Sequence, residues 1–239
     1  MRSNRTNKRK STFREGVAAA WPICLGYFPI GMALGVLGQK AGLGPLWIGL
    51  MSVIVFAGSA QFIGVAMIDG GASAASIIVT TFVVNSRHFL MSSALAVPLK
   101  GVRSLFLCLF AYGITDESFG VNMTRFRKGD WDKWRALIVH HTANTTWIAA
   151  TILGALIGTL IPEGAFGIDY ALPAMFIALL VLQLQGRAYI FTGILAAVTA
   201  IIWKLLVPGE SYIVAAAVIA ATGGFIVRRH LRRKREAAA

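Results

Sequence analysis

Hydrophobic residues form long runs along this chain of 239 residues, and short polar or glycine-containing stretches separate the runs. A bilayer core about 30 Å thick is crossed by about 20 residues of helix, so runs near that length predict transmembrane helices. About eight can be placed: 17–37, 45–68, 72–97, 105–122, 136–161, 169–185, 188–207 and 212–227. The pattern predicts an all-α, polytopic membrane protein with some kinked or discontinuous helices.

Composition supports the membrane class. Hydrophobic residues make up 56% of the chain and charged residues 14%, and the charged fraction is about half that of an ordinary soluble domain. The net charge of +13 raises nucleic acid as a partner, but the bases cluster in two tails and one polar loop, 123–135. Basic clusters beside long apolar runs follow the positive-inside bias, so no nucleic acid partner is expected.

The same bias predicts the topology. With both termini in the cytoplasm and an even number of helices, most Lys and Arg residues fall on the inner side. The chain then divides into a basic N-terminal tail (1–16), a transmembrane domain (17–227) and a basic C-terminal tail (228–239). The two basic tails and the basic loop are expected to bind anionic lipid headgroups.

Four consecutive predicted spans carry polar residues at similar depth. Such residues are costly in hydrocarbon and normally face the bundle interior or water, so each is a candidate for function. They are Gly58, Ser59 and Gln61 in 45–68, Asn85, Arg87 and His88 in 72–97, Asp116 and Glu117 in 105–122, and Asn144 in 136–161.

Arg87 is the most demanding of these residues, because its side chain keeps its charge at every relevant pH. The nearest anions in depth are Asp116 and Glu117, which predicts an ion pair with one of them. On a helix these two carboxylates point about 100° apart, so one can pair with Arg87 while the other carries protons. A pair that only fixes two helices together is the alternative.

His88 is a candidate for proton coupling together with Asp116 and Glu117, because a histidine can titrate near neutral pH. An interior histidine whose hydrogen bonds are satisfied is the alternative. The stretch Gly58-Ser59-Ala60-Gln61 predicts an unwound turn that presents backbone groups to a ligand. Here the alternative is close helix packing through small residues.

Enzyme signatures are weak. The sequence has neither a His-Glu-x-x-His zinc pair nor a phosphate-binding glycine-lysine loop, so no metal, no cofactor and no enzymatic activity are expected. The stretch Gly71-Ala72-Ser73-Ala74 is similar to the serine loop of intramembrane proteases, but alanine follows the serine where glycine is expected. An intramembrane serine protease remains an alternative on that basis.

Four segments in order and spacing resemble the AzlC family, the large subunits of bacterial branched-chain amino acid exporters. They are Phe13-Arg14-Glu15-Gly16, Ala57-Gly58-Ser59-Ala60-Gln61-Phe62, Asn85-Ser86-Arg87-His88 and Thr115-Asp116-Glu117-Ser118-Phe119. The resemblance implies a multi-pass protein of the bacterial inner membrane, an amino acid substrate and a separate small membrane subunit of the AzlD type. It leaves open which amino acid is carried.

A zwitterionic substrate needs a site for its carboxylate and another for its ammonium group. Arg87, or backbone N–H groups near Gly58, can hold the carboxylate, and Asp116 or Asn85 the ammonium. Ser59, Gln61 and Asn144 complete the predicted binding layer, and Phe28 and Phe176 are predicted to form its apolar walls. Proton antiport through Glu117, Asp116 or His88 would drive export. A non-transporting membrane scaffold is the alternative from another class.

Overall fold

The computed structural model describes residues 2–162, 186–207 and 211–237, with isolated positions between 167 and 181. Every element in this part of the chain is helical. The elements are α1 (Arg2–Lys40), α2 (Pro45–Ile54), α3 (Gly58–Asp69), α4 (Ala74–Asn85), α5 (Arg87–Ala96), η1 (Val97–Leu99), α6 (Ser104–Tyr112), α7 (Asp116–Lys128), α8 (Lys133–Ile157), η2 (Gly158–Leu160), α10 (Arg187–Leu206) and α11 (Ser211–Ala237). The predicted all-α class is confirmed.

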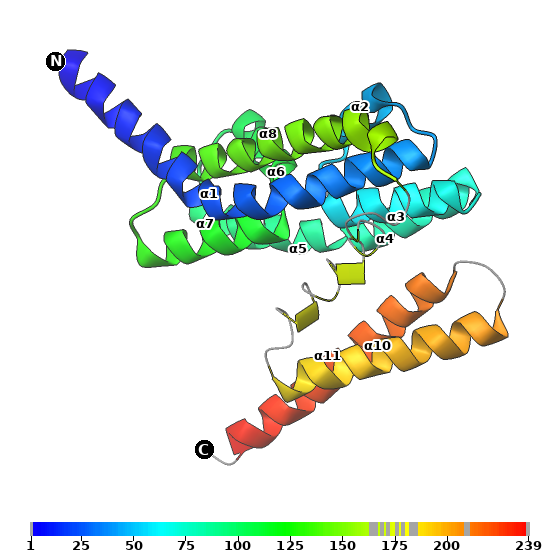
Figure 1. Ribbon diagram of the computed structural model, residues 1–239. Helices are drawn as coiled ribbons and strands as arrows, with labels where there is room; N and C mark the ends of the chain where they lie inside the picture. The colour runs from blue at the N-terminus through cyan, green and yellow to red at the C-terminus, as the bar shows by residue number, and fades with distance from the viewer. Residues whose placement is uncertain are drawn as a thin grey trace. The chain divides into compact units, whose positions relative to one another are not determined.

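The chain divides into two compact units, and each is described by itself. The first comprises Met1–Ala72 and Val84–Ala171, and the second Ser73–Val83 and Leu172–Ala239. In the second unit, α10 and α11 form a helical hairpin (Figure 1). Gly223 and Gly224 of α11 lie against Leu195 and Thr192 of α10, where a larger residue would overlap those side chains.

Helices α1 and α8 run side by side through the first unit (Figure 1). Their crossing depends on two glycines. A Cβ atom on Gly35 would lie 2.1 Å from the carbonyl oxygen of Thr151, and one on Gly154 would lie 2.1 Å from that of Met32. The two backbones therefore touch directly, as small residues allow at helix interfaces in membranes.

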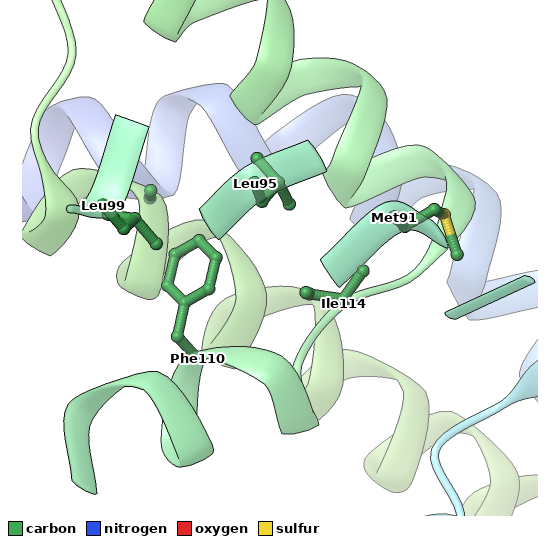
Figure 2. Close-up of a cluster of buried hydrophobic side chains, with 6 residues drawn as sticks. Met91, Leu95, Leu99, Phe110 and Ile114 are labelled. Atoms are coloured by element: carbon green, nitrogen blue, oxygen red, sulfur yellow. The ribbon is translucent and has the colours of Figure 1, made fainter. Parts of the chain in front are cut away.

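A cluster of buried apolar side chains fixes α5 against α6 and α8. It contains Met91, Leu95, Leu99, Phe110, Ile114 and Ala136. Figure 2 shows the Phe110 ring directed at the stretch that carries Leu95 and Leu99, and Ile114 on the side of Met91. Because Ile114 lies between α6 and α7, this packing also holds the link from which α7 starts.

Four helical stretches are long and apolar enough to cross a membrane: Ser11–Lys40, Ala74–Leu99, Lys133–Leu160 and Ala188–Leu206. The predicted runs 45–68 and 105–122 are each divided into two shorter helices, and most of 169–185 lies outside the described residues, as does Phe176. A total of eight spans, and cytoplasmic termini, therefore stay predictions.

The polar loop predicted at 123–135 is shorter in the structure. Helix α7 continues through Lys128 with Arg125, Arg127 and Lys128 in its last turn, where cations interact favourably with the helix dipole. Gly129 ends the helix with a left-handed backbone (φ 77°). Asp132 then caps α8 by accepting from the Trp134 and Arg135 amides.

Candidate functional site

Two helix breaks position the candidate site. Helix α2 ends at Ile54 and α3 begins at Gly58, while α6 ends at Tyr112 and α7 begins at Asp116. The first N–H groups of a helix have no intrahelical acceptor, and the helix dipole is positive there. In α7, Thr115 and Ser118 form a capping box, whereas Ala57 gives α3 no side-chain cap. The first turn of α3 therefore favours an anion.

Arg87 connects these two helix starts. It is the first residue of α5. Its Nη1 lies 3.0 Å from Oδ2 of Asp116, the first residue of α7, and its Nη2 donates to Oγ of Ser59, the second residue of α3. The predicted ion pair is present, and Asp116 rather than Glu117 provides the anion. The side chains are 29% and 30% exposed, so the pair is only partly covered within the first unit.

Glu117 points to a different helix. Its Oε2 accepts a hydrogen bond of 2.7 Å from the hydroxyl of Tyr27 on α1, and the same hydroxyl lies 2.7 Å from Oγ1 of Thr115. The divergence of adjacent carboxylates expected from helix geometry thus places one on Arg87 and the other on Tyr27. Tyr27 is not among the predicted site residues, although a hydroxyl inside an apolar span was a usable signal.

Three buried polar atoms beside the ion pair have no hydrogen-bond partner within the described part of the chain. They are Oδ1 of Asn85, Nε of Arg87 and Nε2 of His88. Buried polar atoms are nearly always paired with protein or water, so each unpaired atom requires an explanation. The three atoms belong to residues 85–88 of the chain, at the junction of α4 and α5.

Gln61 lies in a different network, at the junction of α2, α3 and α8. Its Oε1 accepts from Nε1 of Trp147 at 2.9 Å, and its Nε2 donates to Oγ of Ser52 at 3.0 Å. Ser52 is hydrogen-bonded to Thr151 at 2.9 Å. Both ends of the Gln61 amide therefore bond to protein side chains, and Gln61 ties three helices together.

The unwound turn predicted at 58–61 is displaced in the structure. Gly58–Gln61 form the first turn of α3, and the break covers 55–57, where buried Phe56 adopts a positive φ of 34°. This conformation is unfavourable for an aromatic residue. Gly58 lies against Trp147, since a Cβ there would be 3.0 Å from the indole ring, so close packing explains this glycine.

The two breaks contact each other through Tyr112. The hydroxyl of Tyr112 donates to the backbone carbonyl of Val53, whose usual acceptor role toward residue 57 is lost at the break. Asn144, which is buried, donates to the same hydroxyl at 3.3 Å. Asn144 therefore supports the break rather than contacting the Arg87 pair.

Two further features are a serine at the start of α4 and an open pocket. Ser73, the serine considered for a protease, caps the first turn of α4, where its Oγ accepts from the Ser76 amide at 3.3 Å. An open pocket of about 240 Å³ has walls from the end of α1, the following loop and the end of α8. It is lined by Gln39, Gly42, Leu43, Gly44, Pro45, Ala155, Leu156 and Thr159.

Helices that break within the bundle and bring charged groups to their ends are typical of secondary transporters. The four apolar helical stretches long enough to cross a membrane are those of a multi-pass membrane protein. The chain belongs to the AzlC family, since the family model described as AzlC protein matches residues 22–161. The family membership predicted from four short motifs is confirmed.

Relatives agree with this assignment and place the chain in the inner membrane. "Inner membrane protein YgaZ" of Escherichia coli is 27% identical over 79% of this chain and 82% of its own length. "Branched-chain amino acid transport protein AzlC" of Bacillus subtilis is 25% identical over 88% and 84%. An uncharacterized membrane protein of Archaeoglobus fulgidus is 30% identical over 75% and 79%. No solved structure matches significantly.

Proposed function

We propose that this chain is the large subunit of a proton-coupled exporter of branched-chain amino acids. The observation that carries the proposal is the partly exposed Arg87–Asp116 pair, which joins the first turns of α5 and α7 and contacts that of α3. The similarity to the B. subtilis protein named for branched-chain amino acid transport supports the substrate class. A small membrane subunit of the AzlD type is the proposed partner.

The ion pair suits a zwitterion because each half of the substrate can replace one half of the pair. The substrate carboxylate binds the Arg87 guanidinium and the amides of Gly58 and Ser59 at the start of α3. The ammonium binds Asp116 and the unpaired Oδ1 of Asn85. The Arg87–Asp116 ion pair is thus replaced by two ion pairs with the substrate, and the net charge of the site does not change.

The same arrangement separates substrate binding from proton coupling. Asp116 is held by Arg87, whereas Glu117 faces the neutral hydroxyl of Tyr27. A proton on Glu117 therefore leaves the Arg87–Asp116 pair intact, and Glu117 becomes the main candidate for exchange. His88, with an unpaired Nε2 one residue from Arg87, is the second proton-coupling candidate, and Asp116 the third when substrate opens the pair.

Efflux measurements test the proposal. Cells loaded with leucine, isoleucine, valine or methionine and expressing the chain with its small partner should release them, and a proton uncoupler should stop net export. Arg87→Lys and Asp116→Asn should abolish efflux while their amounts in the membrane stay normal. Asp130→Asn is the matched control, because Asp130 forms an exposed pair with Arg125, 3.6 Å long, in the loop after α7.

Each result bears on a separate part of the proposal. Unimpaired efflux from both site variants rejects the site and favours a scaffold in which the pair only joins helices. Efflux that persists after uncoupling would reject proton antiport. Equal release with and without the small subunit would reject the small subunit as a required partner.

A further inference from the structure

Tyr27 occupies an unusual position between two groups of the first turn of α7. Its hydroxyl lies 2.7 Å from both Oγ1 of Thr115 and Oε2 of Glu117. The side chain is buried, and its ring packs edge-on against Trp147 with the centroids 5.2 Å apart. The ring is therefore held in place, and the hydroxyl stays within reach of both partners.

A phenol has a single hydroxyl hydrogen, so Tyr27 can donate to only one of these partners at a time. When Glu117 is ionised, Tyr27 donates to the carboxylate and accepts from the Thr115 hydroxyl. When Glu117 is protonated, the acid donates to Tyr27, and Tyr27 donates to Thr115. Thr115 can then donate to Oγ of Ser118 at 3.3 Å, and Ser118 to the Gly113 carbonyl at 3.2 Å.

We infer that Tyr27 is a positioning residue for proton uptake at Glu117, through a hydrogen-bond chain that reverses direction with the charge of that carboxyl. Both directions use the same atoms, so the hydrogen bond between Glu117 and Tyr27 is kept in each charge state without movement of the helices. The link to transport rests on the proposed function. The hydrogen-bond chain itself does not.

The ionisable surroundings favour Glu117 for this role. Asp116 precedes it and is paired with Arg87, and His88 follows Arg87 on α5. Thr115 also caps α7 by accepting from the Ser118 amide at 3.3 Å. The hydrogen-bond chain therefore ends in the cap of the helix whose first residue is Asp116, which connects the charge of Glu117 to the helix end that presents the binding pair.

Infrared spectroscopy of the purified full chain in lipid nanodiscs tests the inference without transport. The carbonyl band of protonated Glu117 is assigned by its loss in Glu117→Gln and followed against pH. Tyr27→Phe removes a donor to the carboxylate, so the band of the protonated acid should persist to higher pH than in the wild type. Replacing Tyr27 with 3-fluorotyrosine keeps the ring and strengthens the donor, so the midpoint should fall.

Tyr189→Phe is the matched control, since Tyr189 belongs to α10 and phenylalanine keeps the ring that Arg228 contacts at 5.9 Å; the Glu117 band should respond to pH as in the wild type. The inference is overturned if both Tyr27 replacements leave the pH midpoint of the Glu117 band unchanged, or if both move it in the same direction. It is also overturned if no Glu117 band titrates while the protein stays folded. A wild type that moves no amino acid would reject the proposed function and leave this titration unaffected.

Discussion

Arg87 and Asp116 are the first residues of two different helices, α5 and α7, and their side chains meet at 3.0 Å. A cation at a helix start opposes the helix dipole, whereas an anion there is favoured. The start of α7 therefore favours Asp116, whereas Arg87 follows α4 after the single residue Ser86, which has helical backbone angles. The ion pair with Asp116 and the bond to Ser59 hold the Arg87 side chain.

Exchanging the two charges distinguishes a pair that binds substrate from a pair that only joins two helices. Arg87→Asp and Asp116→Arg should each destabilise the protein by about 1–3 kcal/mol, less than for a fully buried pair because both groups are partly exposed. The double variant restores opposite charges and should recover much of the melting temperature. Efflux should stay lost, because the carboxylate and ammonium sites are reversed. Recovered efflux would show that the pair only joins helices.

The crossing of α1 and α8 should tolerate no side chain at Gly35. Gly35→Ala places a methyl group against the backbone of Thr151, and such overpacking costs about 1–3 kcal/mol. Gly26→Ala is the matched control on the same helix, because nothing lies within 4 Å of its Cβ position. Thermal unfolding in detergent should show a lower midpoint for Gly35→Ala alone. Equal midpoints would mean that the two helices can separate without cost.

Sequence reasoning located the charged pair because an arginine that cannot lose its proton requires an anion at the same depth. It did not locate the helix break at 55–57, where Val55, Phe56 and Ala57 carry no proline or glycine. At the break, the Tyr112 hydroxyl donates to the Val53 carbonyl, a tertiary contact that the local sequence does not indicate. Tyr27 was missed for a related reason, since its partners lie about 90 residues away on another helix.

Gln61 shows a different limit of sequence reasoning. Its depth in the membrane was inferred from the span, but which side of α3 faces α8 depends on packing. Gln61→Leu should leave the Trp147 indole and the Ser52 hydroxyl without their partner, which costs about 1–3 kcal/mol for each buried group. Melting temperature should fall, while the apparent substrate affinity of the folded fraction should change little. Thr145→Val, which removes a hydroxyl that donates to the His141 carbonyl within α8, is the control.

A large loss of affinity in Gln61→Leu at unchanged melting temperature would contradict this assignment. It would return Gln61 to the substrate layer in which the sequence analysis placed it.

The predicted topology can be checked by cysteine labelling. Buried Cys24 and exposed Cys108 are first replaced by serine, and one new cysteine is placed at Lys100, in the exposed turn before α6, or at Arg232, in the basic C-terminal tail. With both termini in the cytoplasm, a membrane-impermeant maleimide should label Lys100→Cys in intact cells. Arg232→Cys should react only after permeabilisation, because the positive-inside bias keeps the tail on the inner side. Labelling of both positions in intact cells would place the tail outside and require an even number of spans between Lys100 and the tail, where five are predicted.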